Sequence, residues 1–326
     1  MPSPSSSLSS LRPDLAGSLL EFDVAMNREG FIGLQVAPVL NVAKSSGTYG
    51  VIPVEQLLQN RDTARAPGSG YSRGKFTFTT ASFATDEHGA EEPIDDRQAR
   101  LYSEYFVAER IAAVRAYDAV LRNHEKRVAS LIFNTTTYTG SSLTTAVGTP
   151  WSTIASATPV TDVEAACRKV WDNSGMWPNT LIINRHIFRY LRQCTQVKDL
   201  IAASGAGFPN RPQDITTAML SAVFDLPKIV VAGGAKASQN EGQTAAFANI
   251  WGNGYAMVCY TSDSPDIQAP TLARTFHWAE DGSQIGGTVE TYRDETIRGD
   301  VVRVRHDTDE RIIYTELGHL LTSIAS

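Results

Sequence analysis

The longest regular pattern of apolar and polar positions lies between residues 95 and 133. Apolar side chains recur there at steps of about three and four residues, and neither proline nor glycine interrupts the stretch. Asp96 stands where an N-cap is expected. At ~1.5 Å per residue, the pattern predicts one helix about 55 Å long, several times the usual helix length. Such a helix would span a whole domain.

Residues 45–93 show a different pattern, with too few large apolar side chains to form a core. Residues 47–54 and 75–79 resemble strands, and the second segment alternates polar and apolar positions. Between them, residues 66–70 are rich in glycine and proline. We therefore expect a long hairpin with a polar tip, which must lean on a neighbour because it cannot bury itself.

Residues 150 to about 260 alternate between helical and strand patterns, which predicts a sheet with helices packed on it. Thr161 to Glu164 form a capping-box motif, and the helix that it starts is expected to stop at Gly175. Further helices are predicted at residues 186–201 and 214–224, and strands at residues 181–183, 228–232 and 255–261.

Strand patterns return after Arg274. The predicted strands cover residues 287–292, 301–305 and 311–315, all rich in β-branched and charged side chains. The polar run 306–310, with the sequence His-Asp-Thr-Asp-Glu, has the composition of a cation site. Its place between two predicted strands favours a turn instead.

The N-terminal region has little regular pattern. Residues 1–12 are rich in serine and proline, so they should be mobile unless a partner orders them. Residues 22–42 are apolar without a helical or alternating period, which is typical of an extended arm that lies over another part of the molecule.

Composition and charge narrow the class of protein. Hydrophobic residues make up 42% of the 326 residues and charged residues 20%, as in folded, soluble chains. The net charge of -6 argues against a protein whose main task is to grip phosphate backbones. Three cysteines without a CxxC pair indicate buried thiols in a reducing compartment. We find neither a signal peptide nor an apolar run long enough to span a membrane.

No enzymatic motif meets its chemical requirements. Residues 68–75 imitate a phosphate-binding loop, but Phe76 follows the lysine and has no hydroxyl group for magnesium. Residues 231–235 follow a strand but lack the third glycine of a dinucleotide-binding turn. The six histidines include no pair at i, i+4 spacing, and no GxSxG motif is present. We therefore expect no catalytic residue, no cofactor and no metal site, and an enzyme would have to assemble its site from scattered residues.

Six carboxylates gather within eleven positions just before the predicted long helix. We expect them in an exposed, proline-containing connection, where they serve an interface or complement the positive end of the helix dipole rather than catalyse a reaction. They are Asp86, Glu87, Glu91, Glu92, Asp95 and Asp96.

This order of parts resembles the major capsid proteins of tailed bacteriophages, which have the Hong Kong 97-type fold. The resemblance covers nearly the whole chain from Phe22. Ala37-Pro38-Val39, Val42 and Gly47-Thr48-Tyr49-Gly50 resemble the N-terminal arm where it enters the extended loop. Residues 94–133 resemble the spine helix, and Ile250-Trp251-Gly252-Asn253-Gly254-Tyr255 resembles the segment near the strand that leaves the axial domain.

The resemblance implies an α+β fold with five segments. These are an N-terminal arm (1–44), an extended β-hairpin loop (45–93), a peripheral domain with the spine helix (94–149), an α/β axial domain (150–265), and the return strands of the peripheral domain with the C-terminus (266–326).

The resemblance also implies a function and a set of partners. The chain would self-assemble as hexamers and pentamers into the icosahedral shell that encloses the double-stranded DNA of a tailed phage, without sequence-specific DNA contact. Assembly would take place in the host cytoplasm, with a separate scaffolding protein, a portal and a decoration protein as partners, and without a membrane. Two alternatives stay open: an encapsulin-like nanocompartment shell, and a soluble α/β enzyme.

We expect the contacts between subunits to be electrostatic, because the basic hairpin tip should project away from the acidic segment of its own chain. The predicted contact residues are Arg61, Arg65, Arg73 and Lys75 on the hairpin, and Asp86, Glu87, Glu91, Glu92 and Asp95 before the long helix.

Overall fold

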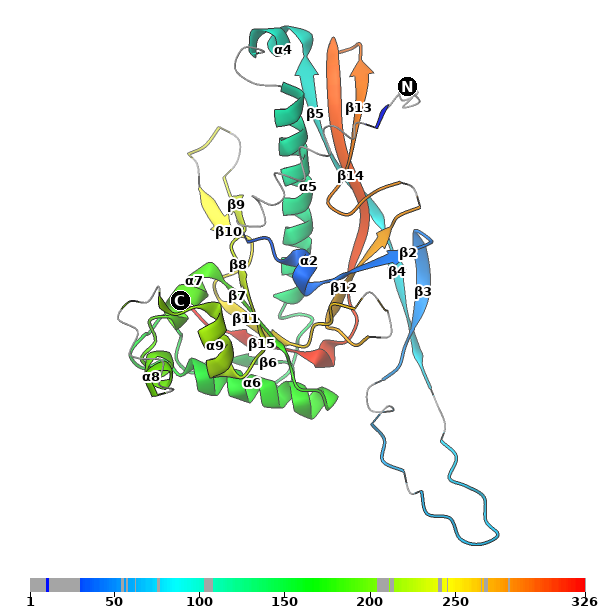
Figure 1. Ribbon diagram of the computed structural model, residues 1–326, viewed down its shortest axis with the longest axis vertical. Coiled ribbons are helices and arrows are strands. Elements are labelled where there is room, and N and C mark those ends of the chain that lie inside the picture. Colours follow the sequence, from blue (N-terminus) through cyan, green and yellow to red (C-terminus); the bar gives the residue numbers. More distant parts are fainter. Residues whose placement is uncertain are drawn as a thin grey trace.

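The chain folds into an elongated molecule with three visible parts (Figure 1). A long helix and a long sheet occupy one end, an α/β part lies toward the other, and a narrow hairpin extends past the α/β part. The structure is a computed structural model that describes residues 10–11, 30–53, 56, 58–61, 63–74, 77–102, 108–203, 211, 214–239, 242–244, 246–264, 266, 269–280 and 282–325. Lys75 and Phe76, the start of the second predicted hairpin strand, lie outside these residues.

A six-stranded sheet, called the long sheet below, forms the peripheral part. Its central strand is β14 (Gly299–Ile312), with β13 (Thr288–Asp294), β5 (Asp86–Asp95) and β12 (Ala273–Trp278) paired antiparallel to it. The strands β1 (Ser10–Leu11) and β2 (Val39–Val42) extend the sheet at its two ends. Ser10 and Leu11, expected to be mobile without a partner, are paired with β13 of the same chain.

The polar run 306–310 is a continuous part of β14, so the prediction of a turn between two strands was wrong. Residues 299–308 pair with β5, and residues 308–312 pair with β12. His306, Asp307 and Thr308 are each 5% exposed or less. The sequence could not reveal this, because the groups that cover these side chains come from distant segments.

The helical pattern begins and ends as predicted but does not form one straight helix. The helix α4 (Asp96–Tyr102) lies across the axis of α5 (Ala108–Ile132) in Figure 1. Asp96 makes two hydrogen bonds with the guanidinium group of Arg293, at 2.7 and 2.6 Å, and these bonds hold α4 at the end of β13. The acidic segment before α4 is likewise not the exposed connection that we expected, since it forms β5.

The axial part contains a five-stranded sheet in the order β6-β15-β11-β7-β8. The strands are β6 (Thr144–Ala146), β7 (Thr180–Asn184), β8 (Lys228–Ala232), β11 (Tyr255–Cys259) and β15 (Gly318–Thr322). Within the segment 266–326, which we expected to hold the return strands and the C-terminus, β15 lies between β6 and β11 of the axial sheet. The short 3-10 helix η3 (Thr315–Leu317) leads into this strand.

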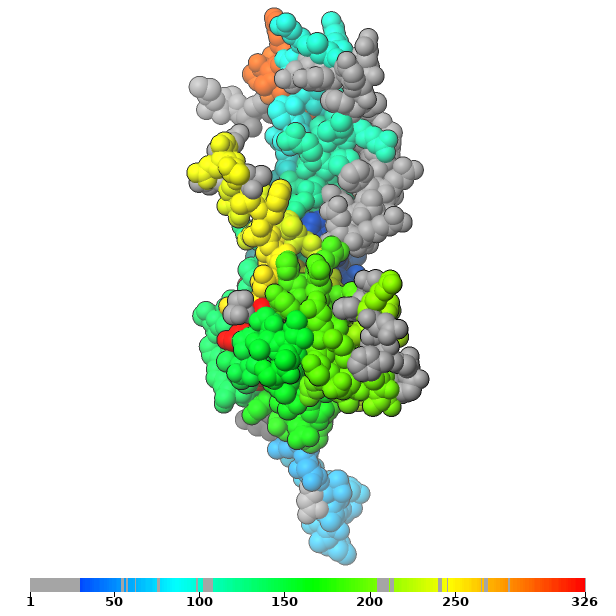
Figure 2. All heavy atoms as spheres, turned by 90° about the vertical axis from the view of Figure 1, so that its left-hand side faces the viewer, coloured from blue at the N-terminus to red at the C-terminus, as the bar shows by residue number. Residues whose placement is uncertain are grey.

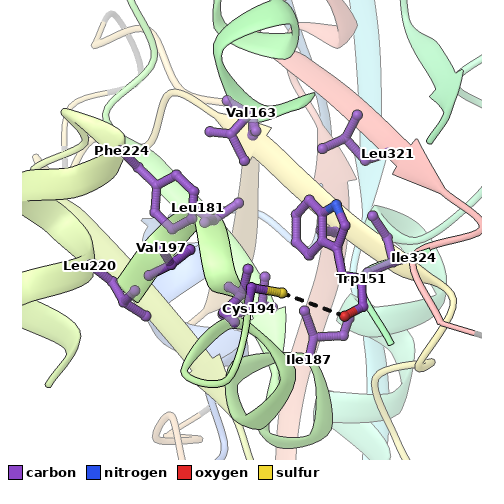
Figure 3. Close-up of a cluster of buried hydrophobic side chains, with 14 of the residues drawn as sticks. Trp151, Val163, Leu181, Ile187, Cys194, Val197, Leu220, Phe224, Leu321 and Ile324 are labelled. Carbon is purple, nitrogen blue, oxygen red and sulfur yellow. Dashed lines mark hydrogen bonds between the residues drawn. The ribbon is translucent and has the colours of Figure 1, made fainter. Parts of the chain in front are cut away.

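Among the described residues, the helices α6 (Pro159–Ser174), α7 (Arg185–Leu191) and α9 (Thr217–Phe224) pack on the axial sheet, and α8 (Thr195–Ala203) packs against α6 and α9. The helix α6 begins after Thr158, so the predicted capping box lies inside its first turn, and it stops as predicted at Gly175 with φ at 67°. The helix predicted over residues 186–201 is broken into α7 and α8. Cys194 lies at this break, buried, and its thiol donates to the carbonyl of Trp151 at 3.6 Å (Figure 3).

A hairpin is present as predicted, but its second strand begins at Thr79, the last residue of the segment 75–79 in which we expected it. The strands β3 (Ser46–Val51) and β4 (Thr79–Ala84) pair from Ser46 with Ala84 to Val51 with Thr79. The aromatic ring of Phe83 stacks on Phe276 of β12 with 4.7 Å between centroids. Beyond β3 and β4 the loop continues as a narrow tail, visible below the α/β part in Figure 2.

Smaller elements join the two parts. The helix α2 (Gly33–Val36) lies beside α5, and a hairpin of β9 (Ala235–Ala237) and β10 (Phe247–Asn249) follows β8. Gly233 and Gly234 connect β8 to β9. Phe247 is 77% exposed on the projecting hairpin.

Candidate functional site

The predicted basic contact residues lie on the projecting part of the extended loop. Arg61, Arg65 and Arg73 are exposed, and Lys75 lies outside the described residues. Arg65 donates from Nε to the carbonyl of Ser69 at 2.7 Å, and its guanidinium carbon lies 4.8 Å from the centre of the Tyr71 ring. These contacts fold the tip on itself but leave the cationic groups accessible.

The predicted acidic contact residues lie on β5, where several have partners in the same chain. Glu91 accepts from Nε of Arg303 at 2.7 Å, and Glu92 lies 3.5 Å from Arg115 of α5. Glu87 lies 3.9 Å from Arg305. An Asp95 side-chain oxygen accepts from the backbone N–H of Arg97 at 2.7 Å. Asp86, the first residue of the strand, is exposed.

A ladder of charges therefore crosses three strands of the long sheet. Glu290 of β13 is 8% exposed, 3.1 Å from Arg305 and 3.6 Å from Arg303, both on β14. Glu91 and Glu87 of β5 approach the same two arginines from the other side. The sequence showed that the return strands were rich in charges, but not that β5 would supply partners for them.

The structure does not bring the basic tip and the acidic strand together within one chain. In Figure 1 the loop extends beyond the α/β part, while β5 runs from the base of the hairpin toward the opposite end of the molecule. The arrangement agrees with the expected direction of the tip. Contact between the two sets in an assembly remains a prediction.

A second polar site joins three segments at the centre of the molecule. The buried carboxylate of Glu125 accepts from the backbone N–H of Ile32 at 2.9 Å and of Gly33 at 2.6 Å. It also accepts from the indole N–H of Trp251 at 2.6 Å. Burial raises the pKa of Glu125, and the three donors act in the opposite direction. Our sequence analysis missed this site, because a glutamate on a helix usually faces solvent.

The cysteines are buried, and the described residues contain no cluster of potential metal ligands. The three cysteines are free and buried, as expected from the sequence. Burial raises the pKa of the Cys167 thiol to about 12 and that of Cys194 to about 11, so both remain protonated and unreactive near neutral pH. Within the same residues, no group of three or more His, Cys, Asp or Glu side chains is arranged to hold a metal ion. No described helix is both long and apolar enough to cross a membrane.

Comparisons with known proteins show which proteins resemble this chain in sequence and in structure. No family model matches the chain. A protein of Burkholderia phage BcepMu named major capsid protein is 26% identical over 230 residues, which is 68% of each chain. A phage-related protein from Bordetella bronchiseptica RB50 has a similar structure, with a TM-score of 0.69, 21% identity, and coverage of 98% of this chain and 99% of that chain.

Two further structures have the same fold at lower identity. The capsid of cyanophage P-SCSP1u gives a TM-score of 0.58 at 12% identity, covering 89% of this chain and 87% of the other. A virus-like particle from Pyrococcus furiosus gives 0.55 at 14% identity, with coverage of 94% and 97%.

The long helix on a long sheet, the α/β part and the projecting hairpin therefore define a class: this chain has the Hong Kong 97-type capsid fold. Within that class, its sequence is similar to that of the phage BcepMu protein named major capsid protein.

Proposed function

We propose that the chain self-assembles into hexamers and pentamers, and through them into the icosahedral shell that encloses the double-stranded DNA genome of a tailed phage. The observation that carries the proposal is the similarity in fold to phage capsid structures over most of the chain, together with the sequence relative named major capsid protein.

The extended loop supports self-association on physical grounds. Leu58, Tyr71 and Phe78 are 61%, 72% and 62% exposed on this loop. Their apolar surface is therefore largely in contact with water, and little of it is buried within the same chain. Burying those side chains against an adjacent subunit would stabilise both partners, since burial of apolar area contributes roughly 25 cal/mol per Å². We infer that each loop lies on a neighbouring subunit in the shell.

The charge of the subunit suits an enclosed genome. A net charge of -6 allows the inner surface to surround a polyanion without binding it tightly. We propose that DNA is held by confinement and not by sequence-specific contact. We also propose a structural role without catalysis, residence in the virion after assembly in the host cytoplasm, and a scaffolding protein, a portal and a decoration protein as further partners.

The proposal is tested by the size and cargo of particles. We expect the full chain, produced together with the other late proteins of its phage, to form closed shells visible by electron microscopy. Light scattering should give a mass of many subunits, and nuclease treatment should leave double-stranded DNA protected inside. A protein that stays a small oligomer at every concentration would falsify the shell assignment.

The nanocompartment alternative has one observation in its favour, the fold shared with the virus-like particle from Pyrococcus furiosus. The sequence relative in a phage favours the capsid assignment. Closed particles that contain a protein cargo and no protected DNA would reverse this preference.

A further inference from the structure

The contact between α5 and the long sheet changes from apolar to polar halfway along the helix. Toward one end, Val302 and Val304 of β14 pack with Tyr117 and Val120 of α5. Toward the other end, Val128 and Ile132 of α5 belong to a separate apolar cluster. A group of polar side chains lies between the two, and we call it the polar joint. It consists of His88, His124, Arg127, His306, Thr308 and Glu310.

Three elements contribute one histidine each to the polar joint. His306 of β14 is in the middle, with its ring centroid 6.1 Å from that of His88 on β5 and 6.1 Å from that of His124 on α5. His306 is 1% exposed and His124 is 3% exposed. The three rings thus lie where the helix and two strands meet.

The polar joint also contains a partly buried ion pair, with Glu310 buried and Arg127 half-buried. Arg127 of α5 donates to both carboxylate oxygens of Glu310, at 2.8 and 2.9 Å, and to the hydroxyl of Thr308 at 2.9 Å. His124 lies 3.5 Å from the same carboxylate through its Nε2 atom. The carboxylate of Glu310 can therefore also accept a hydrogen bond from His124 when Nε2 of that ring carries a proton.

His306 is different, because neither of its ring nitrogens has a hydrogen-bond partner among the described residues. The neutral form of the imidazole ring is therefore more stable at this buried position than the protonated form. A protonated ring carries two N–H donors and a full charge, and both would be buried without an acceptor. The positive charge of Arg127 adds repulsion.

We propose that His306 makes the polar joint sensitive to acid, so that its protonation loosens α5 from β14 and β5 at this point. The device belongs to the fold of the subunit and goes beyond the assembly function proposed above.

Burial lowers the pKa of His306 from 6.5 to about 3 and that of His124 from 6.5 to about 4. A group with a depressed pKa binds protons more readily once the joint opens, so opening becomes easier as the pH falls below about 6.5. The stabilising effect of the neutral rings is complete above that pH and is lost progressively toward pH 3 to 4.

The charged neighbours partly offset one another. Glu310 favours protonation of His124 and His306, whereas Arg127 and the adjacent histidines oppose it. Near His88, Arg127 also opposes protonation, while Glu310, Asp86 and Asp309 favour it. Because Glu310 is already paired with Arg127 and lies beside His124, His306 is the ring whose charge finds the least compensation.

Hydrogen–deuterium exchange of the full chain, followed by mass spectrometry between pH 7.5 and 4, tests the inference. Exchange must be divided by the intrinsic rate of an unstructured peptide at each pH. We expect the corrected exchange of peptides from residues 120–132 and 302–310 to rise as the pH falls. In His306→Leu and in His306→Gln, neither of which titrates in this range, the rise should be absent or shifted lower by ~1 pH unit or more.

His186, exposed on α7, provides the matched control, since His186→Leu removes a histidine far from the polar joint and should leave the rise unchanged. Two non-titrating variants are used so that a folding failure of the leucine variant does not end the test. A rise that persists in both His306 variants, or that is absent from the parent protein, overturns the proposal. The measurement applies to free subunits as well as shells, so it does not depend on whether shells form.

Discussion

The carboxylate of Glu125 accepts hydrogen bonds from three donors that belong to distant parts of the chain. The N-terminal arm supplies the N–H groups of Ile32 and Gly33, and Trp251, next to the axial strand β11, supplies its indole N–H. Glu125 itself lies on α5. One side chain therefore fixes the arm and the axial part against the long helix.

Replacing Glu125 with alanine should lower the free energy of unfolding of the subunit by about 2–4 kcal/mol, because three buried donors lose a charged acceptor. Glu125→Gln keeps one acceptor oxygen and should cost less. Chemical denaturation monitored by circular dichroism measures both changes. Glu164, 55% exposed on α6 and paired with Arg168, is the matched control, and Glu164→Ala should change stability by about 0.5 kcal/mol or less. Equal effects of the two alanine variants would contradict the role assigned to Glu125.

Individual residues were predictable where local chemistry decides their structure. Gly175 ends α6 because it adopts a positive φ, and the cysteines are buried as their spacing suggested. His306 was not predictable in this way. A run of five polar residues normally forms a turn, and only the packing of α5 and β5 on β14 makes it a buried strand.

At the level of elements, the extended loop has little support from its own subunit. Its strands β3 and β4 meet the long sheet mainly through the rings of Tyr49 and Phe83 against Phe276. Leu58 reaches Gly175 at the end of α6, yet most of its side chain is exposed.

Replacing residues 55–74 with a short Gly/Ser linker should leave the subunit folded but unable to form a closed shell. The replaced side chains contribute little apolar burial to the subunit, so the thermal midpoint should change only slightly. Circular dichroism and electron microscopy give the two readouts. A variant that unfolds or aggregates while the parent is stable would show that the loop belongs to the core.

The existence of the hairpin and the end of the long helix could be read from the sequence, because glycine content and apolar periodicity are local signals. The strand β5 could not. Its acidic residues, glycine and proline are typical of a connection, and pairing with the arginine-rich strand β14 decides the outcome. The break between α7 and α8 was not predictable for a similar reason, because buried Cys194 forms a hydrogen bond with the carbonyl group of Trp151, which is distant in the sequence.

At the scale of the whole molecule, exposed basic and exposed acidic side chains lie on different parts of the chain. Arg61, Arg65 and Arg73 are exposed on the projecting loop, whereas Asp86 and Glu87 are exposed at the base of the hairpin. A single exposed ion pair contributes only ~0–1 kcal/mol, but a set repeated at every contact of a shell can fix its register.

Reversing Arg61, Arg65 and Arg73 to glutamate should block or misdirect shell formation with little effect on the thermal unfolding of the subunit. Reversing Asp86 and Glu87 to lysine in the same chain should restore part of the assembly. These two carboxylates suit the rescue because Glu87 approaches Arg305 only at 3.9 Å, whereas reversing Glu91 would break its closer 2.7 Å contact with Arg303. Electron microscopy at physiological salt is the measurement. Normal shells from the triple arginine variant would mean that these charges only solvate the loop.

The order of the large parts followed from the sequence, but the path of the chain between them did not. After β14 the chain leaves the long sheet, and residues 318–322 then join the axial sheet as β15, between β6 and β11. Short apolar strands carry no local sign of which sheet they will join, so the choice depends on the edges that the other strands leave unpaired.

The position of β15 has a consequence for synthesis. Until the ribosome has translated past residue 322, β6 and β11 lack the strand that lies between them, and the axial sheet remains divided. Domains generally fold during synthesis, with N-terminal ones first, but here the axial part must wait for almost the last residues described. A nascent chain therefore cannot present a finished axial surface before β15 has been translated, and any association through that surface must follow this step.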